Sequence, residues 1–463
     1  MKVNKTEKID VFVTSVKQID NLFMISGVTS KGRVLVNSHK KFKPGEFIQF
    51  QGTINEADEI REINAIHADI LENKKAKQEI NDYIESNIKI NKTTPFFSDE
   101  ITKKLSDGFD EAAKRIVKAI FLHRPILIRH HNDTDGICCG LAMYLSIGNI
   151  KNVKIIINNY PAYRMIEAQQ DMELIHQLDT EYLPPLLMVS DLGSSMDSFD
   201  SYDYIKKASF EIIVTDHHPP SPDLEKHVDL IVSPYFVGGS SAYTAGFLTS
   251  EISQRIAKIN FHDLPFIALV GDKSTLEFNR KDSYLRYAIA LGYLVSIKNP
   301  TIEEIARNFF DKEAIEMNYM QAIERIEVVK QNLLRKVKTK KINHVSIFLI
   351  STDKEFEQGK FPDRGMMANI ISDELALRLK TPAITIGYGK RNINMRFNRA
   401  ALDSGWNGGE LVKIMREELS NALESGGGHP GAASIRINKG FAKITLEQLL
   451  KEIEKEANDY TDK

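Results

Sequence analysis

One stretch decides how this chain is expected to fold: Ile126-Leu127-Ile128-Arg129-His130-His131-Asn132-Asp133-Thr134-Asp135-Gly136. A short apolar run that stops at polar residues is typical of a buried strand in a parallel sheet. Asp133 and Asp135 follow that strand, and Gly136 allows a sharp turn into a helix predicted over Gly136–Ile147. Because ligand sites form at the carboxyl ends of such strands, the stretch predicts both a fold and a place for chemistry.

Three more acidic motifs follow apolar runs. Leu186–Val189 precedes Asp191, Ile212–Val214 precedes Asp216-His217-His218, and Ala268–Val270 precedes Gly271-Asp272. We interpret these runs as buried strands, although the longer segment Leu264–Val270 also has the pattern of a helix. Five carboxylates that converge at one sheet edge would repel one another, and divalent cations would offset that repulsion. The four motifs therefore predict a metal site.

Composition sets the outer limits of the interpretation. A chain of 463 residues with 42% hydrophobic and 27% charged residues is expected to form several soluble domains. No apolar stretch has the length of a membrane span, and the adjacent Cys138 and Cys139 suit a reducing cytoplasm. Since the net charge is −2, any polyanion site must be a local patch, such as Lys31–Lys43 or Arg335–Lys341. Each run is otherwise an ordinary solvated surface.

The hydrophobic pattern divides the chain into five parts. They are a small β-barrel of the oligonucleotide-binding (OB) type (1–72), a helical connector (73–122), an α/β lobe (123–298), a helical linker (299–342) and a second α/β lobe (343–463). An SH3-like barrel or a purely structural module also fits the first part. Phe23, Phe42 and Phe47 would be available for base stacking if they are exposed.

The residue types point to a particular chemistry. Imidazole and carboxylate ligands together suit Mn²⁺, Co²⁺ or Zn²⁺ better than Mg²⁺, and we expect Mn²⁺ first. Two ions about 3.5–4 Å apart, bridged by an aspartate and a hydroxide, suit the hydrolysis of a phosphate ester. The sequence shows no evident Ser–His–Asp or Cys–His nucleophile set.

A second motif lies in the C-terminal part. The segment Ser425-Gly426-Gly427-Gly428-His429-Pro430-Gly431 predicts a glycine loop whose backbone N–H groups approach an anion, with His429 as a further donor. Arg396 lies in strand-like sequence and would reach the same anion. The alternatives are a helix cap for the glycines and an ordinary surface arginine for Arg396.

Together these motifs resemble the DHH phosphoesterase superfamily, and the C-terminal part resembles its DHHA1 domain. The resemblance covers roughly residues 123–463 and implies two α/β lobes. Metals would lie on the first lobe, and the second would bind substrate phosphates through Arg396, Gly426, Gly427, Gly428 and His429.

The resemblance also implies a role for each motif residue. One ion would bind Asp133 and Asp191, and the other would bind Asp135, Asp191, His217 and Asp272. Asp191 would bridge the ions, His218 would contact the scissile phosphate, and Asp216 would orient His217. Some members of the family have a metal-binding histidine four residues before the first aspartate. Arg129 occupies that position here, and His131 is the expected substitute.

The order of barrel, DHH lobe, helical segment and DHHA1 lobe is similar to that of archaeal RecJ-like nucleases, the Hef-associated type above all. This implies a metal-dependent exonuclease on single-stranded DNA or RNA that works 3′→5′ in DNA repair or replication. Expected partners are single-stranded nucleic acid and a repair helicase, nuclease or replication protein, with no membrane. Three alternatives stay open: a 5′→3′ replication-associated nuclease, a phosphodiesterase on oligoribonucleotides or cyclic dinucleotides, and a non-catalytic replication scaffold.

Overall fold

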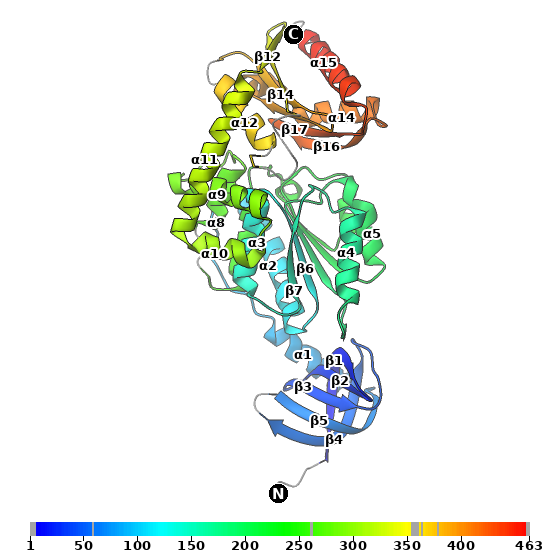
Figure 1. The fold of residues 1–463 in the computed structure, drawn as a ribbon. Coiled ribbons are helices and arrows are strands. Elements are labelled where there is room, and N and C mark those ends of the chain that lie inside the picture. Colours follow the sequence, from blue (N-terminus) through cyan, green and yellow to red (C-terminus); the bar gives the residue numbers. More distant parts are fainter. Residues whose placement is uncertain are drawn as a thin grey trace. The chain divides into compact units, whose positions relative to one another are not determined.

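The computed structural model describes residues 6–57, 60–259, 263–352, 361–362, 364–376 and 379–459. They form two compact units, one within residues 1–277 and the other within residues 278–463. The first unit holds a β-barrel and a parallel α/β sheet, and the second holds a mixed α/β sheet with helices (Figure 1). The predicted α/β class with an N-terminal barrel is confirmed, whereas the finer division into five parts stays a prediction.

Five strands close the N-terminal barrel: β1 (Thr6–Ile19), β2 (Leu22–Thr29), β3 (Gly32–Ser38), β4 (Phe47–Ala57) and β5 (Ile60–Ile70). Around the barrel the order is β1-β2-β3-β5-β4, and β4 pairs with β1 again. Only the β3–β5 contact among these is parallel. Alternate apolar residues such as Val11, Val13 and Ile25 point inward and are fully buried, which is the period of two that the sequence predicted.

The phenylalanines considered for base stacking are not exposed. Phe42 lies in the barrel core, 5% exposed, and its ring packs edge-on against Phe50 at 5.4 Å. Phe47 packs against Phe12 at 4.9 Å between ring centroids and is half-buried, as is Phe23. Packing of the barrel therefore accounts for these rings.

Two helices follow the barrel, α1 (Lys74–Asn87) and α2 (Glu100–Phe121). Ile80 and Ile84 of α1 share a core with Val28 of the barrel and with Leu183. The two-residue strand β8 (Glu181–Tyr182) pairs with β1 of the barrel. The barrel is thus packed into the first unit at two places far apart in the sequence.

A fully parallel sheet forms the centre of the first unit. Its strands are β6 (Ile126–His131), β7 (Val153–Asn158), β9 (Leu186–Ser190), β10 (Glu211–Thr215) and β11 (Leu230–Val232). The spatial order is β11-β10-β9-β6-β7. The chain therefore moves from β6 to β7 on one side, and then crosses to β9, β10 and β11 on the other side of β6. The carboxyl ends of β6 and β9 therefore meet at the switch point, where such sheets bind ligands.

Helices cover this sheet: α3 (Thr134–Ile147), α4 (Met165–His176), α5 (Phe199–Lys206), α6 (Leu224–His227), α7 (Ala245–Ile256) and α8 (Leu264–Gly271), with short 3₁₀ turns at Met196–Ser198 and Pro234–Val237. Asp272 follows α8, so our interpretation of Ala268–Val270 as a strand is wrong and the helical one is confirmed. An apolar run of this length does not by itself distinguish a strand from a buried helix segment.

The second unit contains a six-stranded sheet in the order β12-β13-β14-β15-β17-β16. The strands are β12 (Lys338–Ile342), β13 (Val345–Ser351), β14 (Ala383–Tyr388), β15 (Asn392–Phe397), β16 (Leu423–His429) and β17 (Ala432–Ile437). The helices are α9 (Asp282–Lys298), α10 (Ile302–Phe310), α11 (Lys312–Leu334), α12 (Arg364–Ala376), α13 (Arg399–Asp403), α14 (Gly408–Glu418) and α15 (Ala442–Asp459).

Two local predictions for this unit are wrong. The glycine segment is not a loop, because Gly426, Gly427 and Gly428 lie within strand β16 and pair with β17. The basic run Arg335–Lys341 does not end the helical linker, because its second half forms strand β12. In the part of the chain that the structure covers, none of the helices is long and apolar enough to cross a membrane.

Candidate metal centre

The turn after β6 fixes the first carboxylate. Asp133 caps helix α3, where its Oδ1 accepts a hydrogen bond from the backbone N–H of Gly136 at 3.0 Å. Its Oδ2 lies 2.8 Å from Nδ1 of His131. A Cβ atom at position 136 would lie 2.4 Å from the His131 carbonyl oxygen, so this tight turn requires glycine. The sequence therefore brings His131 and Asp133 together at the end of β6.

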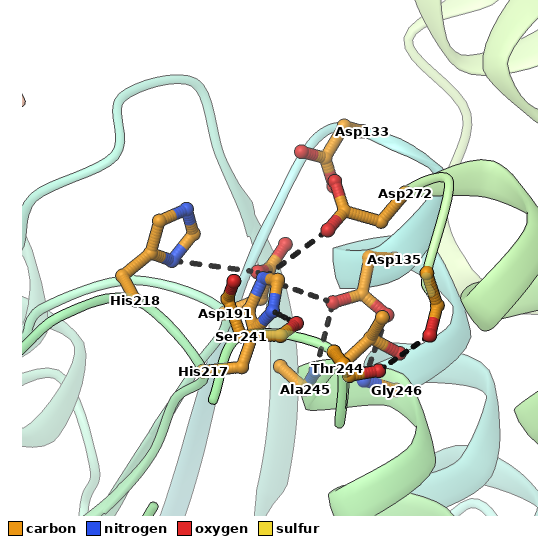
Figure 2. Close-up of polar contacts among 12 residues, drawn as sticks. Asp133, Asp135, Asp191, His217, His218, Ser241, Thr244, Ala245, Gly246 and Asp272 are labelled. Carbon is orange, nitrogen blue, oxygen red and sulfur yellow. Dashed lines mark hydrogen bonds and ion pairs between the residues drawn. The ribbon is translucent and has the colours of Figure 1, made fainter. Parts of the chain in front are cut away.

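Asp135 is held from a different part of the chain. It is 2% exposed, and its two carboxylate oxygens accept hydrogen bonds from the backbone N–H groups of Ala245 at 2.8 Å and Gly246 at 2.9 Å (Figure 2). These donors belong to the first turn of α7, where the helix dipole also favours a negative charge. A Cβ atom at position 246 would lie 2.8 Å from Oδ1 of Asp135, so a side chain there would displace the carboxylate.

Asp191 occupies the centre of the site. It follows β9 with a positive φ of 61° and is 1% exposed. Neither carboxylate oxygen has a hydrogen-bond partner among the described residues. Oδ1 lies 3.4 Å from Nε2 of His217, and Oδ2 lies 3.7 Å from Nδ1 of His131. Burial, together with the charges of Asp133 and Asp135, raises the pKa of Asp191 well above its usual range.

His217 is oriented for metal binding by a backbone carbonyl. Its Nδ1 lies 2.8 Å from the carbonyl oxygen of Ser241 and donates a hydrogen bond to it. Nε2 is then the ring atom that faces three carboxylates: Asp191, Asp135 at 3.6 Å and Asp272 at 3.8 Å. A hydrogen bond from the other ring nitrogen is the usual arrangement of a metal-binding histidine.

Asp272 completes this side of the site. Partial desolvation raises its pKa to about 6, the charges of Asp135 and Asp133 add to the effect, and His217 opposes it. The side chain remains 39% exposed, so Asp272 is open to solvent, as Asp133 is with 50% of its side chain exposed.

Asp216 does not orient His217, contrary to our prediction. Its Oδ1 accepts hydrogen bonds from the backbone N–H of His218 at 3.1 Å and from Nδ1 of His218 at 2.8 Å, and its Oδ2 accepts one from the backbone N–H of Ser194. Burial lowers the pKa of His218, but the charge and hydrogen bond of Asp216 outweigh it and raise that pKa to about 9. Asp216 thus holds an imidazolium beside the site.

The predicted ligands form two groups that share one residue. His131, Asp133 and Asp191 offer ligand atoms within 4.8 Å of one another, and so do Asp135, Asp191 and His217. The unpartnered oxygens of Asp191, one turned toward each group, fit a bridging carboxylate. Oxygen and imidazole donors in this arrangement suit two divalent cations of borderline character.

One segment that supports the site carries none of the sequence motifs. We call residues 240–246 the clamp segment, because its backbone holds two predicted ligands and the chain beside a third. The Ser241 carbonyl oxygen accepts a hydrogen bond from His217, and the N–H groups of Ala245 and Gly246 donate to Asp135. The Ala242 carbonyl oxygen accepts one from Oγ of Ser274 at 2.6 Å, two residues after Asp272. Its signal in the sequence is weak: small residues before a helix that Thr244 caps.

Arg129 points away from the metal centre. Its guanidinium forms a buried ion pair with Asp171 of α4, 2.7 Å from Nη2 to Oδ1, and Tyr163 donates to the same carboxylate. The position that carries a histidine ligand in some DHH proteins is therefore structural in this chain, and His131 is the imidazole beside Asp133.

The predicted anion-binding residues lie in the second unit. Arg396 of β15 and His429 of β16 are both register partners of Ala432 on the strand between them, so one row of the sheet carries both side chains. The guanidinium of Arg396 bonds to Asn369 of α12 and to the Met395 carbonyl oxygen. A Cβ atom would meet no atom within 4 Å at Gly427. The backbone of this glycine is therefore open to a ligand.

Comparisons with known proteins relate part of this chain to one family. Residues 125–265 match the model of the DHH family, N-terminal domain. The chain is 26% identical over 475 residues to the uncharacterized protein MJ1198 of Methanocaldococcus jannaschii, a match that covers 88% of this chain and 62% of that protein. It is 27% identical over 177 residues to the uncharacterized protein MJ0831 of the same organism, covering 37% of each. The chain thus spans less than two thirds of these curated relatives.

Two solved structures share the fold. The DHH domain of a protein assigned to a family of ribosomal proteins gives a TM-score of 0.73 at 24% identity, covering 82% of this chain and 98% of that one. RecJ from Thermus thermophilus, solved in complex with Mn²⁺, gives a TM-score of 0.50 at 15% identity, covering 76% of this chain and 55% of that one. Residues 125–265 thus match one family, and the two solved structures share the fold of this chain.

Proposed function

We propose that this chain is a metal-dependent exonuclease that hydrolyses phosphodiester bonds of single-stranded DNA or RNA. The observation that carries the proposal is Asp191, a fully buried carboxylate without a hydrogen-bond partner among the described residues. A buried charge of this kind is costly unless cations compensate it, and two ligand groups flank it.

Two divalent cations would be held by the residues already described. One would take His131, Asp133 and Asp191, and the other would take Asp135, Asp191, His217 and Asp272. When bound, such ions lower the pKa of water and neutralise charge on a phosphoryl group. We propose Mn²⁺ as the native ion, with Mg²⁺, Co²⁺ and Zn²⁺ as competitors.

His218 and Asp216 would act on the substrate itself. With a pKa of about 9, His218 carries a proton at neutral pH, and the hydrogen bond to Asp216 fixes its ring. An imidazolium at this place would donate a hydrogen bond to a non-bridging phosphate oxygen and stabilise the negative charge that develops there.

Substrate class and direction rest on the second unit, the barrel and the resemblance to RecJ-like nucleases. Arg396, Gly427 and His429 offer donors for a further phosphate, which a polynucleotide has and a simple ester lacks. We propose 3′→5′ cleavage, in DNA repair or replication, with a helicase, nuclease or replication protein as partner.

The test is hydrolysis of single-stranded DNA and RNA labelled separately at each end, with and without Mn²⁺. We expect Mn²⁺-dependent release of mononucleotides, with a ladder that shortens from the 3′ end. Asp133→Ala and His217→Ala should abolish it. Full activity in both variants would refute the proposed site, and shortening from the 5′ end would reverse the proposed direction alone.

One observation favours a second candidate, a phosphodiesterase on oligoribonucleotides or cyclic dinucleotides. The phenylalanines of the described part of the barrel are buried or half-buried, so they give little surface for stacking the bases of a long strand. The ratio of kcat/KM for a 30-mer to that for a dinucleotide, measured on the full chain, separates the candidates. The exonuclease should favour the 30-mer, and the small-substrate enzyme the dinucleotide.

A further inference from the structure

The basic run that the sequence singled out becomes the edge strand β12 of the second unit. From residue 328 to residue 352 the sequence has no aspartate or glutamate, and it has six basic residues: Lys330, Arg335, Lys336, Lys338, Lys340 and Lys341. In β12 itself Lys338, Lys340 and Lys341 are all exposed. We call these three lysines the β12 strip.

Few carboxylates neutralise the β12 strip. Lys340 Nζ lies 4.0 Å from Oε2 of Glu454, and both side chains are about half exposed. Within the described part of the chain, Lys338 and Lys341 form no ion pair with a carboxylate. Such exposed pairs contribute little, so the strip presents concentrated positive charge to solvent.

Protection of the sheet edge explains only part of this pattern. Lysines on an edge strand prevent pairing with another sheet, but that role does not require a regular spacing of the charges. Lys338 and Lys340 stand at alternate positions of an extended strand, about 7 Å apart. Regularly spaced cations match the repeated phosphates of a polynucleotide better than one compact anion. The intervening Thr339 offers no apolar anchor for a lipid surface.

We propose that the β12 strip binds the phosphate backbone of a single-stranded nucleic acid. The inference rests on the proposed function for the class of substrate and adds a binding surface outside the metal centre. Affinity should therefore increase with strand length and fall steeply with salt, because each lysine–phosphate contact releases a condensed counterion.

The experiment compares two triple variants of the full chain. The strip variant is Lys338→Gln, Lys340→Gln and Lys341→Gln. The control variant, Lys443→Gln, Lys451→Gln and Lys455→Gln, removes the same charge from exposed positions on α15 of the same unit. Binding of a fluorescent oligo(dT) 30-mer is measured by anisotropy over a series of NaCl concentrations, without Mn²⁺. Hydrolysis of a dinucleotide is measured with Mn²⁺, and circular dichroism melting checks that both variants fold.

We expect the slope of log Kd against log salt to fall by about 2 in the strip variant, because it loses three lysines and each phosphate neutralised on a single strand contributes about 0.7. The slope should stay unchanged in the control variant. Dinucleotide hydrolysis should be the same in both. Equal reductions in the two variants, or wild-type binding by the strip variant, would overturn the inference. Weaker binding to anionic phosphatidylserine vesicles, with oligo(dT) binding intact, would also overturn it. A wild type that binds oligo(dT) through the strip without hydrolysing any nucleic acid would refute the proposed function and leave the strip standing.

Discussion

At the scale of single residues, Asp191 is the residue whose environment is least favourable for a carboxylate. The residue has a positive φ of 61°, is 1% exposed, and lacks a hydrogen-bond partner for either carboxylate oxygen within the described residues. Strained, buried and unpartnered groups persist where the surroundings impose them, and they cluster at functional sites. We therefore expect Asp191 to destabilise the fold without cations, and bound cations would be bridged by its two oxygens.

The variant Asp191→Asn separates these two effects. The amide removes a buried charge, so we expect the free energy of unfolding of the metal-free variant to exceed that of metal-free wild type by about 1 kcal/mol. The variant should also lose the stabilisation by Mn²⁺ and more than about 100-fold in activity. Thermal melts with EDTA and with Mn²⁺ measure both effects. Asp200→Asn, at an exposed position of α5, is the control and should change neither. A less stable metal-free Asp191→Asn protein would contradict this account.

Metal affinity should depend on pH through Asp272. With its pKa raised to about 6, this carboxyl favours the metal-free fold while it is protonated, and the contribution is lost as pH rises through 6. Mn²⁺ must displace the proton, so affinity should rise from pH 5 to pH 7, by up to about 10-fold per pH unit for each proton displaced. Calorimetry in buffers of different ionisation enthalpy counts those protons. Asp272→Asn should flatten the pH dependence, and an unchanged profile in that variant would exclude this role.

Residue identities were predictable, and residue partners were less so. The four motifs at the ends of apolar runs, taken together, pointed to Asp133, Asp135, Asp191 and His217, and the structure brings these side chains together. The partner of Asp216 was predicted wrongly, because both histidines lie within two residues of it and only the backbone direction selects His218. The backbone groups that hold His217 and Asp135 could not be predicted, because nearly every residue carries the same N–H and C=O groups.

At the scale of elements, strands with β-branched and aliphatic runs were predicted well, and segments whose state depends on neighbours were not. Leu264–Gly271 is helical although its apolar run is short enough for a strand. The glycine segment disfavours a strand by its own propensity. Its pairing with β17 and its contact with α14 impose one nevertheless: a Cβ atom on Gly426 would lie 3.0 Å from Val412. Tertiary packing decided both cases.

The clamp segment yields a prediction for one hydroxyl. Ser274 Oγ donates to the Ala242 carbonyl oxygen at 2.6 Å and ties the chain after Asp272 to the support of His217. Ser274→Ala should lower Mn²⁺ affinity by about 10-fold while the fold is retained. Ser146→Ala is the control, because its hydroxyl bonds within α3 to Met143. Calorimetric titration measures the affinity, and equal values for both variants would show that the bond does not support the site.

The glycines of β16 should separate structure from binding. Gly428 has a φ of +152°, and a Cβ atom there would lie 2.4 Å from both the Ala432 oxygen and Ala433 Cα, so Gly428→Ala should destabilise the second unit by about 1–3 kcal/mol. Gly427→Ala has free space and should fold normally. If its backbone receives a phosphate, the added methyl should raise KM for the oligonucleotide. Urea unfolding and steady-state kinetics measure the two effects, and a normal KM for Gly427→Ala would remove that glycine from the binding site.

At the scale of the whole molecule, all eight predicted residues of the metal centre come from the first unit, and the anion-binding row comes from the second. A ligand that binds only the native form stabilises the unit that holds its site. We therefore expect Mn²⁺ to slow hydrogen exchange around Ile126–His131, Leu186–Ser190 and Glu211–Thr215 and to leave β12 and β13 unchanged. Exchange mass spectrometry with and without Mn²⁺ tests this, with Ca²⁺ as a control for ionic strength. Equal slowing in both units would contradict the assignment.

The short strand β8 has a consequence for anyone who would engineer this protein. The barrel is attached by the polypeptide that continues into α1, and it is also joined by Glu181 and Tyr182, which pair with Ser15 and Val16 from more than a hundred positions downstream. Lys41 bonds to the same Glu181 at 2.5 Å. A chimera that exchanges only the N-terminal module would leave that distant strand without its partner. Modular swapping of the barrel therefore has to transplant two pieces of sequence together, and homologous recombination at a single crossover would not deliver them.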